Sequence, residues 1–317
     1  MKKRTLVFIC LVCLLAISAC SINKMAINAV SNALTGEGSS EVFTGDSDPA
    51  LVGEALPFAI KMFEALLSQN PKHDGLILMT GSLFVMYANA FVQGPAEMLP
   101  PEEYEAHSEG KARAKKLYLR GAELLYSGLE KKYPGFSKAK ADDGTLDAIL
   151  KKCKKADVGL LYWAVAGSLA AYSVDVFDFE LADSIPEWSA MIKRAYELNP
   201  NHDGAAIDEF FIQFYGSLPS SLGGDMELAK SHFQKAIEKT KNTSVGAYVS
   251  YVQSVCLPER DYDGFKENLE KALAIDVNAN KSTRLVNIIN QRKAQHLMDT
   301  AYNFFSFLPG PYDYDEW

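Results

Sequence analysis

The sequence predicts an all-α fold built from repeated helix–turn–helix units. From Leu51 onward, apolar residues recur at helical spacing, and no stretch suggests a strand longer than a few residues. A hexapeptide also occurs twice, as Asn70–Gly75 and as Asn199–Gly204, each time between two apolar runs. With 317 residues, of which 48% are hydrophobic, the chain can bury a sizeable core. A motif that recurs indicates a structural unit that recurs.

Each hexapeptide is predicted to form the corner between two helices. Pro71 and Pro200 cannot donate a helical hydrogen bond and disfavour helical geometry in the residue before them, so the first helix must stop there. Gly75 and Gly204 each follow an aspartate, whose side chain can cap the next helix, while the glycine leaves the backbone free to turn sharply. Pro134 marks a further corner of this kind. These five residues are given structural roles.

Residues 1–19 are predicted to be a signal peptide. Lys2, Lys3 and Arg4 precede an uncharged run from Leu6 to Ala16. This run is too short to span a bilayer, but it suits the core of a signal peptide. The chain is therefore expected to be exported.

The end of this segment, Leu15 to Cys20, resembles the lipobox of bacterial lipoproteins. The resemblance implies that Cys20 is lipidated and becomes the new N-terminus, anchored by several acyl chains because one chain alone holds only marginally. In the alternative interpretation, an ordinary signal peptidase cleaves the chain and Cys20 is a chance thiol. Ser21 stands where some envelopes use aspartate to retain a lipoprotein at the inner membrane. A periplasmic protein attached to a membrane is expected, with the outer membrane slightly favoured.

Composition divides the rest of the chain into three segments. Residues 20–50 are rich in Ser, Gly, Asn and Asp, and are predicted to form a flexible lipidated tether with one or two helical turns. Residues 51–308 are predicted to form the helical domain, and residues 309–317 an acidic tail. The last unit of a repeat array has no neighbour, so the helix predicted at residues 294–307 is expected to cap the array.

Five segments share one residue spacing, which resembles the second helix of the tetratricopeptide repeat. In that helix a small residue, an aromatic residue, a small residue and a proline occupy fixed offsets. The matching positions are Ala59, Phe63, Leu66 and Pro71; Ala122, Tyr126, Leu129 and Pro134; Trp188, Ile192, Ala195 and Pro200; Ala229, Phe233, Ala236 and Lys241; and Phe265, Leu269, Ala272 and Val277. The last two segments lack the proline, so the repeats are degenerate. The resemblance implies a superhelix of helix pairs.

Charge and motifs argue against several functions. Without residues 1–19, the chain has 29 Lys and Arg residues against 40 Asp and Glu residues, a net charge of −11, which disfavours nucleic acid as a partner. The metal, phosphate and nucleophile motifs of common enzymes are missing from the sequence, so no enzyme activity, metal or cofactor is expected. His73 and His202 are predicted to be turn residues. Cys153 and Cys256 are expected to be buried thiols, although an oxidising compartment leaves a disulfide open.

The predicted first helices of the repeats are apolar almost all the way round. The four stretches are residues 76–87, 158–166, 210–215 and 245–252. A helix that is apolar on all sides must be buried on all sides. Two interpretations stay open: these helices line an enclosed apolar cavity, or they fill a dry core.

The combined features resemble the T components of tetratricopeptide-repeat-associated TRAP transporters, the TatT family. The most similar stretches are the Asn-Pro-x-His-Asp-Gly corners, the Ser221–Asp225 run and the helix after it. The resemblance implies a non-enzymatic periplasmic lipoprotein and homo-oligomer, with a pore through its superhelix. It further implies association with the extracytoplasmic solute-binding P subunit, to which a hydrophobic small molecule or lipid is passed.

Periodicity and the pore of that family together select eight aromatic candidates for the lining of a ligand site. They are Phe84, Tyr87, Trp163, Phe211, Phe214, Tyr215, Tyr248 and Tyr251. The alternative function is a generic tetratricopeptide scaffold that binds peptides or other envelope proteins in an open concave groove. Such a scaffold predicts polar first helices bearing Asn and Lys, and this sequence has few of these.

Overall fold

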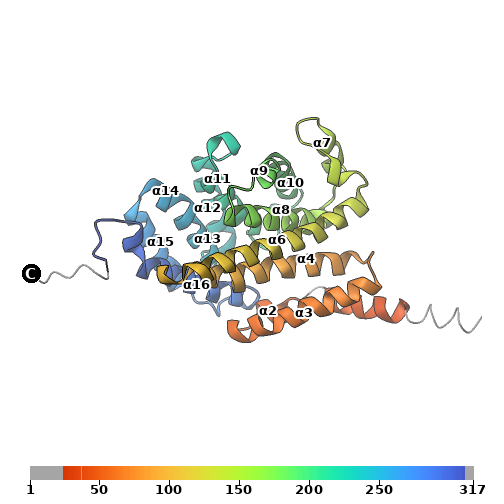
Figure 1. Ribbon diagram of the computed structural model, residues 1–317, viewed down its shortest axis with the longest axis horizontal. Coiled ribbons are helices and arrows are strands. Elements are labelled where there is room, and N and C mark those ends of the chain that lie inside the picture. Colours follow the sequence, from red (N-terminus) through yellow and green to blue (C-terminus); the bar gives the residue numbers. More distant parts are fainter. Residues whose placement is uncertain (1–23, 37, 311–317) are drawn as a thin grey trace, which may run out of the picture.

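The computed structural model describes residues 24–36 and 38–310, and every regular element within these ranges is a helix (Figure 1). The all-α prediction is therefore confirmed. The signal peptide, Cys20 and most of the acidic tail lie outside the described residues. The longer α-helices are α3 (Pro49–Gln69), α4 (Asp74–Ala88), α6 (Tyr104–Lys132), α8 (Val158–Val174), α10 (Ile185–Leu198), α11 (Ala206–Ser217), α12 (Met226–Thr240), α13 (Val245–Tyr251), α15 (Tyr262–Ala274) and α16 (Arg284–Asp299).

Shorter elements connect these helices. The short α-helices are α2 (Glu41–Thr44), α5 (Gly94–Glu97), α7 (Thr145–Leu150), α9 (Phe179–Ala182) and α14 (Leu257–Glu259). Two π-helical segments, η1 (Asn89–Gln93) and η6 (Val252–Cys256), continue α4 and α13. Each π-helical segment is followed two residues later by a proline, which has no amide hydrogen to continue the α-helical ladder.

Successive long helices pack against each other along much of the chain. Helix α4 contacts α3, α6 and α8; α8 also contacts α10; and α13 contacts α11, α12, α15 and α16. The five predicted second-helix patterns lie on α3, α6, α10, α12 and α15, and the four apolar stretches lie on α4, α8, α11 and α13, hereafter called the first helices. Two segments of the described chain, Asp74–Glu97 and Lys155–Val174, are long and apolar enough to cross a membrane, yet 56% of the 18-residue apolar stretch in each is buried inside the protein.

Three glycines allow close crossings between these helices. A Cβ atom on Gly81 of α4 would lie 2.5 Å from Leu125 Cγ, and one on Gly167 of α8 would lie 2.9 Å from Val85 Cγ2. A Cβ atom on Gly216 of α11 would lie 2.4 Å from the Ser254 carbonyl oxygen. Real Cβ atoms do not approach their neighbours this closely, so glycine is required for the packing.

The two copies of the hexapeptide form different corners. Helix α3 ends at Gln69, and His73, not the predicted Asp74, caps α4, because His73 Nδ1 accepts a hydrogen bond from the Leu76 amide at 3.1 Å. Asp74 instead binds Lys131 of α6, with 2.5 Å between Oδ1 and Nζ. In the second copy, α11 begins only at Ala206, after Gly204 has taken a left-handed φ of 75°. Two hexapeptides that differ only at their third residue therefore form different turns, and the lysine at each corner has a different partner: Asp74 for Lys131, and the Pro200 carbonyl oxygen for Lys239.

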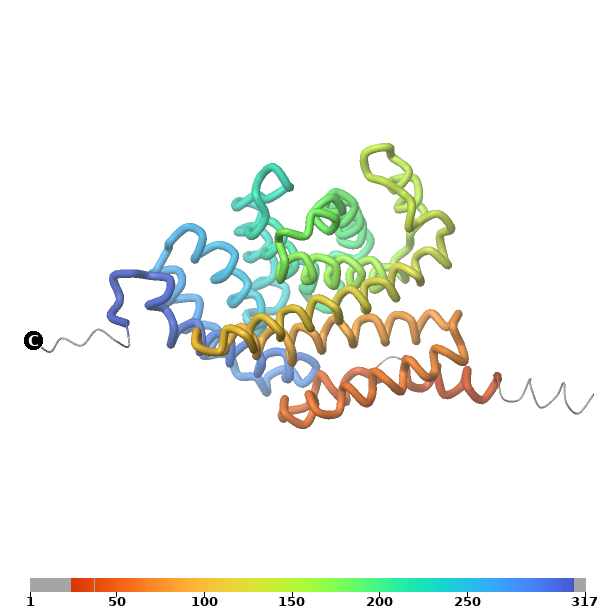
Figure 2. Tube along the Cα trace, in the orientation of Figure 1, coloured from red at the N-terminus to blue at the C-terminus, as the bar shows by residue number. Residues whose placement is uncertain are grey.

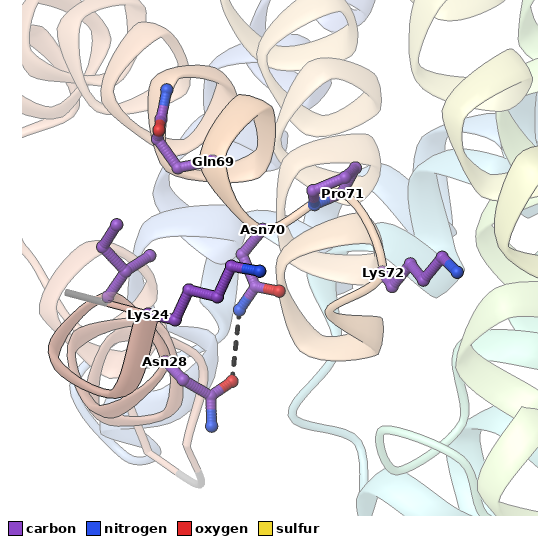
Figure 3. Close-up of a pocket in the computed structure, with 7 residues that line it drawn as sticks. Lys24, Asn28, Gln69, Asn70, Pro71 and Lys72 are labelled. Carbon is purple, nitrogen blue, oxygen red and sulfur yellow. Dashed lines mark hydrogen bonds between the residues drawn. The ribbon is translucent and has the colours of Figure 1, made fainter. Parts of the chain in front are cut away.

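The segment before α3 differs from the predicted flexible tether. Residues 24–35 form a helix that packs on the α3–α4 corner and borders a groove of about 340 Å³ (Figure 3). Asn70 Nδ2 donates to Asn28 Oδ1 at 3.1 Å, and His73 Nε2 lies 2.9 Å from Asn32 Oδ1. A Cβ atom on Gly75 would lie 2.5 Å from Thr35 Oγ1, so this glycine makes room for the helix rather than for a turn.

The C-terminal end also differs from the predicted cap. Helix α16 ends at Asp299, not near residue 307, and the chain continues as a 3₁₀ turn. Buried Phe305 then packs on the rings of Phe265 and Tyr262, each with a centroid distance of 5.1 Å. Packing of separate aromatic rings, which helical spacing does not reveal, replaces the predicted last turns of the helix.

Helix α16 is not a free outer cap, because it contacts α2 and α3 at the other end of the chain (Figure 2). Arg284 Nη1 donates to the Gly45 carbonyl oxygen at 3.3 Å. Leu285 is buried in one cluster with Val52 and Leu56 of α3. Helix α16 and the α2–α3 segment therefore cover each other.

Both cysteines of the described chain are free thiols, as predicted. Cys153 and Cys256 are each buried, and they belong to different hydrophobic clusters. Burial raises the pKa of both thiols, that of Cys256 to about 12. Such thiols remain protonated and behave as small apolar side chains.

Candidate functional site

The eight aromatic candidates fall into two groups by exposure. Five are buried, each with 7% or less of its surface exposed: Phe84, Phe211, Phe214, Tyr215 and Tyr248. Three are partly exposed: Tyr87 on α4, Trp163 on α8 and Tyr251 on α13. All three of the partly exposed residues lie on first helices.

The buried group packs as core. Phe211 and Tyr215 stack with a centroid distance of 5.2 Å, and both rings also face His232 of α12. Phe214, which is fully buried, stacks on Phe210 at 5.8 Å. The rings of α11 therefore fill the space between α11 and its neighbours, and they have the contacts of core residues.

The partly exposed group lies in two places. Tyr87 and Trp163 pack beside the same hydrophobic cluster, which includes Val85 and Tyr118, whereas Tyr251 stacks on Phe233 at 4.0 Å. Trp163 also meets the neighbouring ring of Tyr162 edge-on, at 5.1 Å. The structure thus places Trp163 beside one cluster that it shares with Tyr87 and beside a second, larger cluster that it shares with Tyr251.

A row of polar side chains on α11 was not found from the sequence. Glu209, Gln213 and Ser217 are spaced by four residues and face α13 and η6. Their partners are Ser244, Ser250 and Ser254, at 2.6, 2.7 and 3.0 Å respectively. The four-residue spacing was visible in the sequence, but nothing there showed that the serines lie opposite.

Asp208 and Glu209 are neighbours on α11, but their surroundings shift their pKa values in opposite directions. Burial would raise the pKa of Asp208, but hydrogen bonds from His232 and Lys239 outweigh it and hold the pKa below its usual range. Glu209 has no such cation: burial raises its pKa to about 7, the nearby Asp208 adds to the rise, and the Ser244 hydroxyl opposes it. Glu209 is therefore partly protonated near neutral pH.

Glu209→Gln is expected to stabilise the protein at pH 8 but not near pH 4.5. The folded state holds the Glu209 proton more tightly than an ordinary glutamate of pKa 4.5, so the free energy of unfolding falls as the pH rises from about 4.5 to about 7. The glutamine does not titrate, so the variant should gain about 3 kcal/mol at pH 8 relative to pH 4.5. Urea unfolding at both pH values measures this, with the exposed Glu54→Gln as control. An equal difference at both pH values would contradict the expectation.

The histidines of the two corners, His73 and His202, make contacts that stabilise the fold. His73 caps α4, and His202 meets the ring of Tyr162 edge-on at 5.4 Å. Within residues 24–36 and 38–310, no group of three or more His, Cys, Asp or Glu side chains could hold a metal ion.

These features define an all-α protein of packed helix pairs whose first helices keep part of their apolar surface exposed. The sequence model of the TRAP transporter T-component family matches residues 45–305, so the chain belongs to this family. It is also 36% identical, over 93% of its length and 95% of the other chain, to an uncharacterized protein of Treponema pallidum (strain Nichols). Members of the family are extracytoplasmic accessory subunits of TRAP transporters rather than enzymes.

Proposed function

We propose that this protein is a lipoprotein that binds or conducts a hydrophobic ligand and docks on the solute-binding P subunit of a TRAP-type transporter. Cys20 carries the acyl chains, and the body lies in the periplasm as a homo-oligomer, with the outer membrane slightly favoured over the inner one. Membership of the T-component family supports the transport role. The cargo is a hydrophobic small molecule or lipid.

The observation that carries the ligand assignment is the partial exposure of large apolar side chains on helices that are otherwise buried. Leu78 and Met86 of α4, Tyr162 and Trp163 of α8, and Phe210 of α11 are all partly exposed. These helices pack on neighbours along their other faces. Exposed apolar surface on a helix of this kind favours binding of an apolar molecule.

Native mass spectrometry and organic extraction test this function. A form lacking residues 1–20 should carry a co-purifying apolar molecule in a defined oligomer, and this complex should capture a solute-binding P subunit. Trp163→Ala should release the molecule while leaving the melting temperature within a few degrees of wild type, because the ring is only partly buried. An empty monomer that captures peptides alone would favour the tetratricopeptide scaffold instead.

An exposed apolar segment, formed by the loop between α8 and α9 and the first residue of α9, supports partner docking. Phe177 is 80% exposed and Phe179 75% exposed. Asp175 and Asp178 lie on either side of Phe177 in the sequence. Both bind Lys115 of α6, each at 2.7 Å, and so the loop is held on the body of the protein. Exposed aromatic side chains held in place are typical of interface anchors.

Changing Phe177 and Phe179 to serine is expected to weaken the affinity for the P subunit at least about tenfold. A tenfold loss corresponds to about 1.4 kcal/mol of binding free energy. Stability should be unchanged because neither ring is buried. Pull-down titration together with thermal melting measures both effects. Val42→Ser, which alters a 74% exposed side chain on α2, serves as the control. Unchanged capture by the double variant would exclude this loop as the docking surface.

A further inference from the structure

Two polar side chains and one hydroxyl converge on Gly246, near the start of α13. A Cβ atom at this position would lie 3.0 Å from Glu209 Oε2, 3.2 Å from Asn290 Nδ2 and 3.7 Å from Ser244 Oγ. The glycine itself is partly exposed, as are Glu209 and Asn290. Because Gly246 carries no side chain, an acceptor on α11 and a donor on α16 can both approach the same point beside it.

The surrounding contacts fix this arrangement. Asn287, one turn before Asn290 on α16, is 2% exposed and accepts a hydrogen bond from the Val245 amide at 3.1 Å. It also donates to the Thr243 carbonyl oxygen at 2.9 Å. These two bonds hold α16 in register with the start of α13, so Asn290 lies beside Gly246. On the other side, Ser244 Oγ donates to Glu209 Oε1 at 2.6 Å and orients the carboxyl group.

The remaining hydrogen-bonding capacity is unused within the described chain. Glu209 Oε2 accepts no hydrogen bond there, and the Asn290 side chain makes none. The nearby surface is aromatic: Phe210 is adjacent in sequence and lies 6.4 Å from the ring of Tyr162. The negative charge of Glu209 helps burial raise the pKa of Tyr162. A free acceptor and a free donor thus lie at the edge of an apolar surface.

We propose that Glu209, Asn290 and Gly246 form a head-group site that binds the hydroxyl group of an otherwise apolar ligand. This inference rests on the proposed function, because the apolar part of the ligand must lie along the first helices. A hydroxyl group donates to one partner and accepts from another. It therefore satisfies Oε2 of the ionised Glu209 carboxylate and Asn290 Nδ2 together, so the site is complete above the Glu209 pKa of about 7. An ammonium group only donates, and an ionised carboxylate only accepts, so each leaves one of the two unsatisfied.

The site is tested by comparing three ten-carbon probes on the wild-type protein: 1-decanol, methyl decyl ether and decylammonium. Calorimetric titration is expected to show decanol binding about tenfold more tightly than the ether, which lacks the donated hydrogen. Equal affinity for decanol and the ether would overturn the head-group site while leaving the apolar function standing. Binding of none of the probes would overturn both. Tighter binding of decylammonium than of decanol would replace the hydroxyl site by a cation site.

Two variants act on different sides of the site. Asn290→Ala removes the donor, and Gly246→Ala places a methyl group against both Glu209 Oε2 and Asn290 Nδ2 without changing any charge. Each is expected to bring the decanol affinity within about twofold of the ether affinity. Gln295→Ala changes an exposed residue farther along α16 and should keep the tenfold preference. A preference that survives in both test variants would overturn the assignment.

Discussion

Asp208→Ala is expected to lower the free energy of unfolding by about 3–5 kcal/mol, the range found when one partner of a buried charged pair is removed. Asp208 is fully buried, and its two oxygens bind His232 Nδ1 at 2.8 Å and Lys239 Nζ at 2.5 Å. Lys239 also donates to the Pro200 carbonyl oxygen at 2.5 Å, so the carboxylate links α11 and α12 to the second corner. Without it, a buried histidine and a largely covered ammonium group lose their partner.

Chemical unfolding at pH 7 measures this loss. Asp142→Ala, at an exposed loop position, is the control and should change stability by less than about 0.5 kcal/mol. Because the pKa of Asp208 is depressed in the folded state, its stabilising contribution is present above the ordinary aspartate pKa and is lost as the pH falls. The difference between variant and wild type should therefore shrink in acid. A constant difference would show that the carboxylate acts through packing alone.

Phe214→Ala is expected to cost about 3–5 kcal/mol, as large-to-small changes of fully buried aromatic residues do. Its ring has no exposed surface and packs against Phe210 and Tyr215. The same change at Phe177, which is 80% exposed, should cost almost nothing. Differential scanning calorimetry of the two variants makes the comparison. A small effect at Phe214 would mean that α11 borders a cavity, so that the side chains around residue 214 can move to fill the space left by the ring.

The helical fold could be predicted because it rests on signals that repeat along the chain. Apolar residues at helical spacing located the long helices, and Pro71, Pro134 and Pro200 marked where three of them end. The residue that caps the helix after a corner could not be predicted from such signals. Whether His73 or Asp74 caps α4 depends on Lys131, a residue on another helix.

The candidate site could be predicted only in part, because exposure depends on which helix faces meet. Periodicity selected both Phe214 and Trp163 as candidates for the lining of a ligand site, yet Phe214 is fully buried and Trp163 is partly exposed. The pairing of Glu209 with Ser244 joins residues 35 positions apart, and no local pattern identifies such a pair. The helix at residues 24–35 is longer than the one or two turns predicted, and its packing was not predicted because its composition resembled a linker.

The contact between α16 and the α2–α3 segment has a consequence for how the protein unfolds. In an open array of repeats, each unit touches only its neighbours, and the terminal units can fray independently. Here Arg284 and Gly45, 239 residues apart, are hydrogen-bonded, so α16 and the α2–α3 segment cannot separate without each losing the other's packing. Contacts this distant in sequence raise the contact order and slow folding, because a long loop must close before they form. The chain should therefore melt in one cooperative step, and a cut in any connecting loop should loosen both ends together.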